Sequence, residues 1–157
     1  MVFLLAVGAW VSGLSTNVDA DPTANLISTN DVLLIDRCVS SVAGGKCTLT
    51  IGPLRATGDI YGGEYYTKIS PYFFKNEEGR LAILITREAI DQACAGRTVE
   101  ITGTATQNGK DHKSRRIDAT ATPLDGRQGT LRFRFQSGER EMVFDTRYRF
   151  IAADQVP

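Results

Sequence analysis

The chain has 157 residues, a length typical of one compact domain, and its 42% hydrophobic and 23% charged residues argue against disorder as its default state. Its 18 basic and 18 acidic side chains cancel, so it has no overall basic field of the kind that attracts nucleic acid or anionic membranes. One histidine and three cysteines are too few for a metal centre built from imidazole or thiolate ligands, or for histidine-assisted catalysis.

The N-terminus begins with an uncharged, apolar run from Val2 to Leu14. This run is too short to span a membrane, which takes about 20 residues, and it matches the apolar region of a secretory signal peptide. Val18-Asp19-Ala20 fits the cleavage site, although no Lys or Arg precedes the apolar run. We therefore expect residues 1–20 to be a signal peptide, residues 21–157 to be a single domain without a membrane span, and the protein to be secreted or periplasmic. A buried N-terminal segment of the domain is the alternative.

The first two cysteines, Cys38 and Cys47, bracket a segment that contains Gly44-Gly45. A flexible turn at these glycines can bring the two sulfurs together, so we predict a Cys38–Cys47 disulfide in an oxidising compartment. A two-residue turn at Gly44-Gly45 places Cys47 opposite Val42, so the bridge requires a longer, irregular loop. Two buried, reduced cysteines are the alternative. Cys94 lies on the apolar face of a predicted helix, where we expect it to pack.

Short runs of alternating apolar and polar residues, separated by Gly, Asn and Asp, dominate the chain from Asp31 onward. This pattern predicts an all-β fold. One short helix is predicted from Thr86 to Ala95, with Thr86 as its N-cap and Gly96 ending it. The predicted strands cover residues 32–39, 46–51, 54–61, 65–75, 80–86, 97–106, 115–122, 130–136 and 140–150.

Two predicted hairpins indicate how the domain packs. The hairpin at 97–122 presents one apolar face of small residues, and the hairpin at 130–150 presents one face of large ones. We expect the large side chains to fill the volume that the small ones leave, which makes the second hairpin an integral part of the domain. The small inward residues include Gly103, Ala105, Ala119 and Ala121, and the large ones include Leu131, Phe133, Phe135, Met142, Phe144, Tyr148 and Phe150.

The C-terminal hairpin also carries a face of arginines. A two-residue loop at Ser137-Gly138 places Phe133 opposite Met142 and Arg134 opposite Glu141. Arginine side chains suit the recognition of phosphate, sulfate or carboxylate groups. The alternative is a solvated face whose charges are compensated by neighbouring carboxylates. Its arginines are Arg132, Arg134, Arg147 and Arg149.

The order of elements across residues 54–122 is three strands, a short helix and a hairpin, in the segments GDIYGGEYYTKISPYFFK, GRLAILI, TREAIDQACAG, RTVEITGTATQNG and RRIDATA. This order resembles the OB-fold, the oligonucleotide/oligosaccharide-binding barrel, and the sequence resembles small bacterial envelope proteins. The resemblance implies a five-stranded OB-like barrel, here elaborated by extra N- and C-terminal strands. It also implies a binding face on the second and third strands of that barrel.

Six of the thirteen aromatic residues lie between Tyr61 and Phe74. Rings interleaved with cations can stack on bases or sugars and hold phosphates. Neighbouring residues of a strand point to opposite faces, so about half of these rings must instead pack in the core. The candidate ligand-binding residues are Tyr66, Lys68, Tyr72, Phe74 and Arg55.

Motifs for catalysis or cofactor binding are not found in the sequence. It has no GxSxG nucleophile, no Walker phosphate loop and no GxGxxG segment, and we predict no catalytic residue, metal or cofactor. The prediction is a secreted or periplasmic, non-enzymatic binding or structural module with a ligand or protein partner, and nucleic acid is not expected. One alternative is an OB domain that binds an oligonucleotide or oligosaccharide through Tyr61–Phe74. The other is a hydrolase with carboxylates from distant strands.

Overall fold

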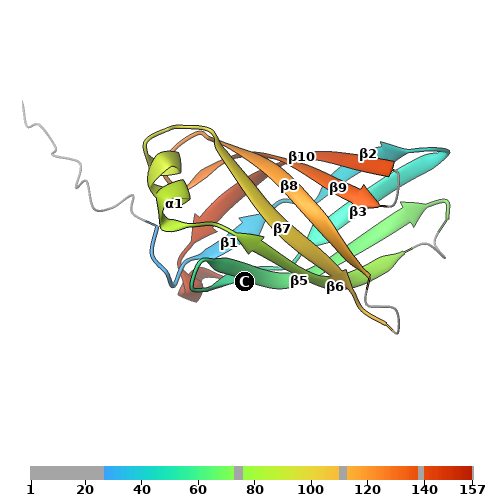
Figure 1. Cartoon of the computed structure of the whole chain (residues 1–157), viewed down its shortest axis with the longest axis horizontal. Coiled ribbons are helices and arrows are strands. Elements are labelled where there is room, and N and C mark those ends of the chain that lie inside the picture. Colours follow the sequence, from blue (N-terminus) through green and yellow to red (C-terminus); the bar gives the residue numbers. More distant parts are fainter. Residues whose placement is uncertain (1–26, 73–75, 110–112, 138–139, 157) are drawn as a thin grey trace, which may run out of the picture.

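The computed structural model describes residues 27–72, 76–109, 113–137 and 140–156, which form one antiparallel sheet closed into a barrel (Figure 1). The predicted signal peptide lies outside the described residues. The strands of the sheet are β1 (Val32–Ile35), β2 (Cys38–Val42), β3 (Gly45–Ile51), β4 (Leu54–Thr57), β5 (Ile60–Ser70), β6 (Glu77–Leu84), β7 (Val99–Gln107), β8 (Ser114–Pro123), β9 (Gln128–Ser137) and β10 (Arg140–Ile151). The order of the strands in the sheet is β2-β3-β5-β4-β1-β10-β9-β8-β7-β6, and an additional pairing of β5 with β6 closes it.

The closed barrel has eight walls, where a wall is either one strand or two short strands that lie end to end. Two of the eight walls are of the second kind. β3 and β4 pair with successive parts of one edge of β5, whose other edge pairs with β6. β1 pairs with the end of β10, and β2 lies beside an earlier part of the same strand. Between β1 and β2, the backbone N–H of Asp36 donates to the carbonyl of Arg147 at 2.9 Å and keeps this wall attached.

The all-β class with one short helix is confirmed, but the predicted five-stranded barrel is wrong in its strand number. The N-terminal and C-terminal strands are not additions to a smaller, five-stranded barrel. They pair with each other, from Val32 opposite Ile151 to Ile35 opposite Tyr148, and so become walls of the larger one. This pairing joins residues more than a hundred positions apart, and no local pattern in the sequence specifies it.

Alternate residues of the strands point into the barrel and form the core. The predicted match of small and large residues is confirmed, since Phe133 lies opposite Ala119 and Leu131 opposite Ala121 on neighbouring strands. The rings of Tyr61 and Phe150 pack edge to face across the interior, with centroids 5.8 Å apart. Close packing of rings against small residues leaves little free volume inside.

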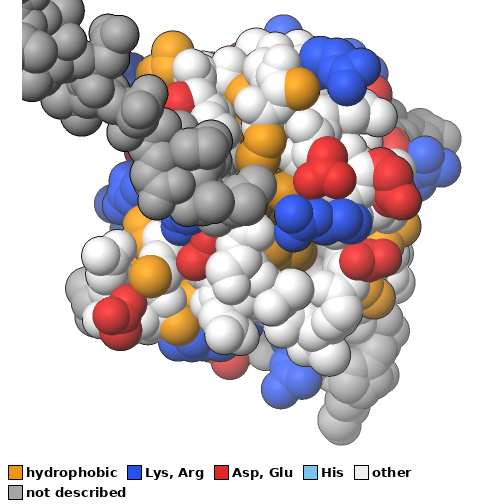
Figure 2. Space-filling view, turned by 90° about the vertical axis from the view of Figure 1, so that its left-hand side faces the viewer, with side chains coloured by type: hydrophobic (Ala, Val, Ile, Leu, Met, Phe, Trp, Pro, Cys, Tyr) orange, Lys and Arg blue, Asp and Glu red, His pale blue; other side chains and the backbone are white. Residues whose placement is uncertain are grey.

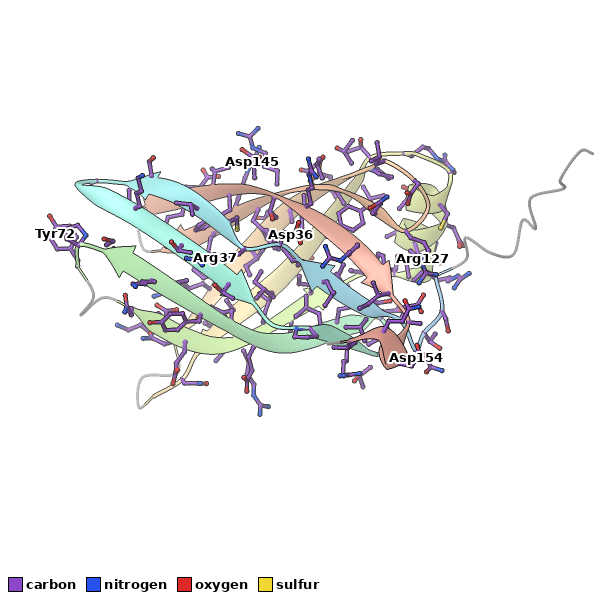
Figure 3. The ribbon with its side chains drawn as sticks, turned by 180° about the vertical axis from the view of Figure 1, so that it is seen from behind. Asp36, Arg37, Tyr72, Arg127, Asp145 and Asp154 are labelled. Carbon is purple, nitrogen blue, oxygen red and sulfur yellow. The ribbon has the colours of Figure 1, made fainter. Side chains whose placement is uncertain are left out.

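Helix α1 (Arg87–Cys94) covers one end of the barrel, which we call the α1 end. Its predicted caps are confirmed, because the Thr86 hydroxyl accepts a hydrogen bond from the Ala89 N–H at 3.3 Å and Gly96 has a φ of 75°. Acidic, basic and apolar side chains are interspersed on the outer surface at this end (Figure 2). The C-terminal ends of β2, β5, β7 and β9 lie at the opposite, loop end, where Tyr72 projects (Figure 3).

The C-terminal hairpin has its predicted faces but a different register. Met142 lies opposite Phe135, Phe144 opposite Phe133, and Glu141 opposite Gln136. Ser137 itself pairs with Arg140, so the turn lies one residue later than predicted. Moving a turn by one residue shifts every pair by two, and a shift of two leaves each side chain on the same face.

Candidate ligand-binding site

The interior at the α1 end is filled by the protein's own side chains. The cavity beneath α1 has a volume of about 30 Å³ and is lined by apolar residues such as Ile83, Ile90 and Phe150. That volume holds roughly one or two water molecules, whereas ligand pockets measure about 300–1,000 Å³. This part of the barrel therefore has no space for a small molecule.

The interior at the loop end contains a polar cluster of three residues, of which Tyr65 is buried and Glu77 and Arg115 are partly buried. The Tyr65 hydroxyl donates to Oε1 of Glu77 at 2.5 Å, and Nη1 of Arg115 forms an ion pair with the same oxygen. Side-chain exposure is 17% for Arg115 and 12% for Glu77. Burial, and then the hydrogen bond to Glu77, raise the pKa of Tyr65, so its hydroxyl stays protonated at neutral pH. One carboxylate oxygen of Glu77 thus binds both the Tyr65 hydroxyl and the Arg115 guanidinium group.

The predicted Cys38–Cys47 disulfide is not present in the structure, where both cysteines are buried free thiols. Cys38 lies opposite Leu49, and Cys47 lies opposite Ser40. The two cysteines are therefore diagonal neighbours, about 7–8 Å apart in an ordinary ladder, and most disulfides require a shorter Cα separation. Burial, and then the neighbouring Cys47, raise the pKa of Cys38 to about 11.

A concave site lies on the outer surface of β3, β5 and β6, with a volume of about 360 Å³. We call it the Tyr66 groove. Tyr66 lies at its centre, opposite Thr50 on one neighbouring strand and opposite Glu78 on the other. Register across three strands therefore brings together residues that are distant in the sequence. The groove is lined by Thr50, Gly52, Glu64, Tyr65, Tyr66, Glu78, Gly79 and Asn108.

The Tyr66 ring is held by Asn76, whose amide makes two hydrogen bonds. Its Nδ2 donates to the Tyr66 hydroxyl at 3.1 Å, and its Oδ1 accepts from the Ile69 N–H at 2.9 Å. Asn76 thus connects the ring to the backbone of β5. Behind the groove, Gly79 allows Tyr65 to pack inward, since a Cβ at Gly79 would lie 2.8 Å from the Tyr65 ring.

The electrostatics of the Tyr66 groove are acidic. Glu64 and Glu78 are both exposed, and neither carboxylate forms an ion pair or hydrogen bond with any residue that the structure describes. Arg80 lies opposite Glu64 on β6, but no ion pair joins these two described residues. The groove therefore combines an aromatic ring with two carboxylates that are free to accept hydrogen bonds.

The structure brings together only part of the predicted ligand-binding set. Tyr66 and Lys68 point outward from the same face of β5. Arg55 also faces outward, but it lies on β4 opposite Gly62, well along the barrel from Tyr66. Tyr72 is exposed beyond the end of β5, and Phe74 lies outside the described residues.

Of the eight residues that line the Tyr66 groove, only Tyr66 was among the predicted ones, and the missed residues with polar side chains on its outer face are Thr50, Glu64, Glu78 and Asn108. Only Glu64 carried a local signal, because it lies two residues before Tyr66 and so shares its face of the strand. The other three come from different strands or from the connection after β7, and only the register places them near the ring.

Among the described residues, no group of three or more His, Cys, Asp or Glu side chains is arranged to hold a metal ion. Within the same residues, no helix is long and apolar enough to cross a membrane. No protein-family model matches the chain, and neither a curated protein nor a solved structure matches it.

Proposed function

We propose that the protein is a non-enzymatic binding module whose ligand docks on the outside of the barrel, in the Tyr66 groove. The observation that carries this proposal is an exposed, hydrogen-bonded aromatic ring flanked by two carboxylates that pair with no described residue, in a cavity of about 360 Å³. The filled interior at the α1 end supports an external site, because eight-stranded barrels without a lumen cannot enclose a ligand.

A short neutral oligosaccharide is the ligand class that best fits this groove. Sugar hydroxyls are donors that match the acceptor oxygens of Glu64 and Glu78, and a sugar face packs on the Tyr66 ring. An oligonucleotide fits less well, because its negatively charged phosphates would be repelled by the two carboxylates, and neither carboxylate is paired with a described cation. The oligosaccharide alternative is thereby favoured over the oligonucleotide alternative.

We place this binding module outside the cytoplasm, because the apolar leader ending at Ala20 supports secretion. Cell fractionation with N-terminal sequencing of the recovered protein tests this location. We expect a periplasmic or extracellular protein that begins at Asp21. A cytosolic protein with an intact N-terminus would contradict the location and leave the binding proposal to be judged separately.

Binding itself is tested by calorimetry of the purified protein against a panel of neutral oligosaccharides. We expect Tyr66→Ala to weaken binding by about ten-fold or more, and Glu78→Gln to weaken it less. Tyr72→Ala is the matched control, because Tyr72 is 38% exposed and Tyr66 is 42% exposed, while Tyr72 lies outside the groove. The control should bind like the unmodified protein.

Three results would overturn the oligosaccharide proposal. The first is the absence of binding across the panel, and the second is an equal loss in Tyr72→Ala and Tyr66→Ala. The third is tight binding of a single-stranded oligonucleotide that falls steeply with salt and is lost in Tyr66→Ala, which would favour the oligonucleotide alternative. Cleavage of a bound oligosaccharide that disappears in Glu78→Gln would replace the binding module by a hydrolase.

A further inference from the structure

A second groove lies on the outer surface of β8, β9 and β10, with a volume of about 470 Å³. In the order of strands around the barrel, this wall lies opposite β5, and the groove is towards the α1 end. Its lining therefore shares no strand with the Tyr66 groove. We call it the arginine groove, after the two guanidinium groups of Arg147 and Arg149 that line it.

Strand register places hydrogen-bond donors in two rows across the arginine groove. Arg147 lies opposite Thr130, which in turn lies opposite Thr122, so one row crosses three strands. Arg149 lies opposite Gln128 in the second row. Side chains of these residues are all exposed on the outer face. Two guanidinium groups, two hydroxyls, one amide and the carboxylate of Asp36 thus line one surface, and the carboxylate is paired with Arg149.

The arginines on this face differ in their partners. Arg132 pairs with Asp145 at 3.6 Å, Arg134 with Glu141 at 3.7 Å, and Arg149 with Asp36 at 3.1 Å. The predicted compensation of charge is therefore present for these three. The guanidinium group of Arg147 forms no ion pair or hydrogen bond with any residue in the described part of the chain. Its planar, bidentate donor group is available to an anion.

An apolar side chain completes the groove. Leu124 is 81% exposed in the turn between β8 and β9, and it lines the groove with Pro123. Hydrogen bonds hold this turn, because Oδ1 of Asp125 accepts from the Arg127 N–H at 2.8 Å and from the Gln128 N–H at 2.9 Å. An ordered turn thus keeps a large leucine exposed beside a guanidinium group that has no partner among the described residues.

We propose that the arginine groove binds a small organic anion with an apolar substituent. The phosphate, sulfate or carboxylate group lies on Arg147 with hydrogen bonds from Thr130 and Arg149, and the apolar part packs on Leu124. This pairing of a charged group and an apolar group is shared by soluble aryl or alkyl phosphates and by anionic lipids. The site is independent of the Tyr66 groove, so neither proposal depends on the other.

The test is an NMR titration of the isotope-labelled full-length protein with phenyl phosphate, and with inorganic phosphate as the probe that lacks an apolar part. We expect saturable shifts around β9 and β10, with phenyl phosphate binding more tightly. Arg147→Ala should weaken both probes by about ten-fold or more, and Arg147→Lys should weaken them less, since it keeps the charge but loses the fork.

Two further variants separate this site from general charge attraction. Arg132→Ala removes a neighbouring arginine of the same face that is already paired with Asp145, and it should change the affinities by less than about two-fold. Leu124→Ser should abolish the preference for phenyl phosphate while leaving inorganic phosphate unchanged. All of these positions are exposed, so thermal melting should show that each variant remains folded.

The inference is overturned if phenyl phosphate does not saturate, if Arg132→Ala and Arg147→Ala have the same effect, or if Leu124→Ser leaves the preference intact. Vesicles of phosphatidylcholine with phosphatidic acid identify the source of the anion. Sedimentation with these vesicles that is lost in Arg147→Ala points to a lipid, and binding of phenyl phosphate alone points to a soluble ligand. Sedimentation that persists in Arg147→Ala, together with unchanged phenyl phosphate binding, would contradict the site.

Discussion

The two ends of the barrel interior are built on the same strands but filled by opposite chemistry. At the α1 end, the core is apolar throughout its small cavity, and Ile90 of α1 packs onto it. At the loop end, Glu77 and Arg115 form an ion pair inside the barrel, with the hydroxyl of Tyr65 bound to the same carboxylate. Apolar burial stabilises the first end directly, whereas desolvation of two charges offsets much of the attraction at the second.

The alternation of side chains along a strand therefore controls which residues face inward, but it does not require those residues to be apolar. A buried ion pair stabilises little compared with apolar side chains of similar size, yet either member alone is costly. We therefore expect the loop end to be sensitive to single substitutions and tolerant of paired ones. The α1 end should instead respond to each lost methyl group in proportion to the cavity that results.

Removing residues 128–157 disrupts the barrel at both ends and should have the largest effect on stability. β10 pairs with both β9 and β1, so its loss opens the barrel, and the rings of Phe133 and Phe144 leave the core. We expect no cooperative thermal transition by circular dichroism, because the burial lost exceeds the 5–15 kcal/mol by which domains are usually stable. A soluble fragment 1–127 that melts cooperatively would contradict this expectation.

Arg115→Ala should be the most damaging single change at the loop end. It leaves the charge of Glu77 buried without its cation, and we expect a loss of about 3–5 kcal/mol in the free energy of unfolding, measured with urea. The paired control is Arg115→Met with Glu77→Leu in a Tyr65→Phe background, where no hydroxyl loses its acceptor; it removes both charges and should be nearly as stable as Tyr65→Phe alone or more so. Equal losses in the single variant and the paired control would show that the ion pair is not the cause.

Ile90→Ala tests the α1 end in the same denaturation experiment. Ile90 lies against the small apolar cavity, and its truncation enlarges that cavity, so we expect a loss of about 2–4 kcal/mol. Gln92→Ala on the exposed side of the same helix is the control and should stay within about 0.5 kcal/mol. A similar loss in both variants would indicate a general effect on helix stability.

Alkaline pH should also destabilise the protein through buried acids. The pKa of Cys38 is raised to about 11 in the folded state, from an ordinary value near 9. The folded state therefore holds a proton that the unfolded state releases, and stability falls as pH rises between these values, by roughly 2 kcal/mol at pH 11. The raised pKa of Tyr65 acts in the same direction at higher pH.

Urea denaturation with a reductant at several pH values, compared between the unmodified protein and Cys38→Ala, isolates the thiol. The variant should lose less stability than the unmodified protein between pH 9 and 11, because only the unmodified protein carries the shifted group. Contributions of groups distant from Cys38 are the same in both proteins and cancel in the difference. Parallel curves over this range would contradict the pKa assigned to Cys38.

The smallest expected effect concerns the cap of α1. Thr86→Ala removes the acceptor of the Ala89 N–H and should cost about 1 kcal/mol, and Thr86→Ser should retain most of the stability. The effect should be confined to the α1 end, with hydrogen exchange faster in residues 87–94 and unchanged around Arg115. Faster exchange at both ends would show that the cap stabilises the whole barrel rather than its cover.

The local features of this protein, which are the helix bounds and the inward faces of the strands, could be predicted from the sequence. Thr86 and Gly96 bound the helix correctly, and the alternation in β7, β8, β9 and β10 identified the inward faces, because capping and the two-residue period depend on neighbouring residues alone. Even the misplaced turn after Ser137 left those faces correct, since the register moved by two residues.

Which strands pair, and in which register, is seen only in the tertiary structure. The pairing of β1 with β10 turned a predicted five-stranded barrel into an eight-walled one, and the register of β2 with β3 set Cys38 and Cys47 diagonally instead of in a bridge. Register also joined Tyr66 to Thr50 and Glu78. These outcomes depend on contacts between segments far apart in the chain, where many pairings satisfy the same alternation and only the packing of the whole barrel selects one.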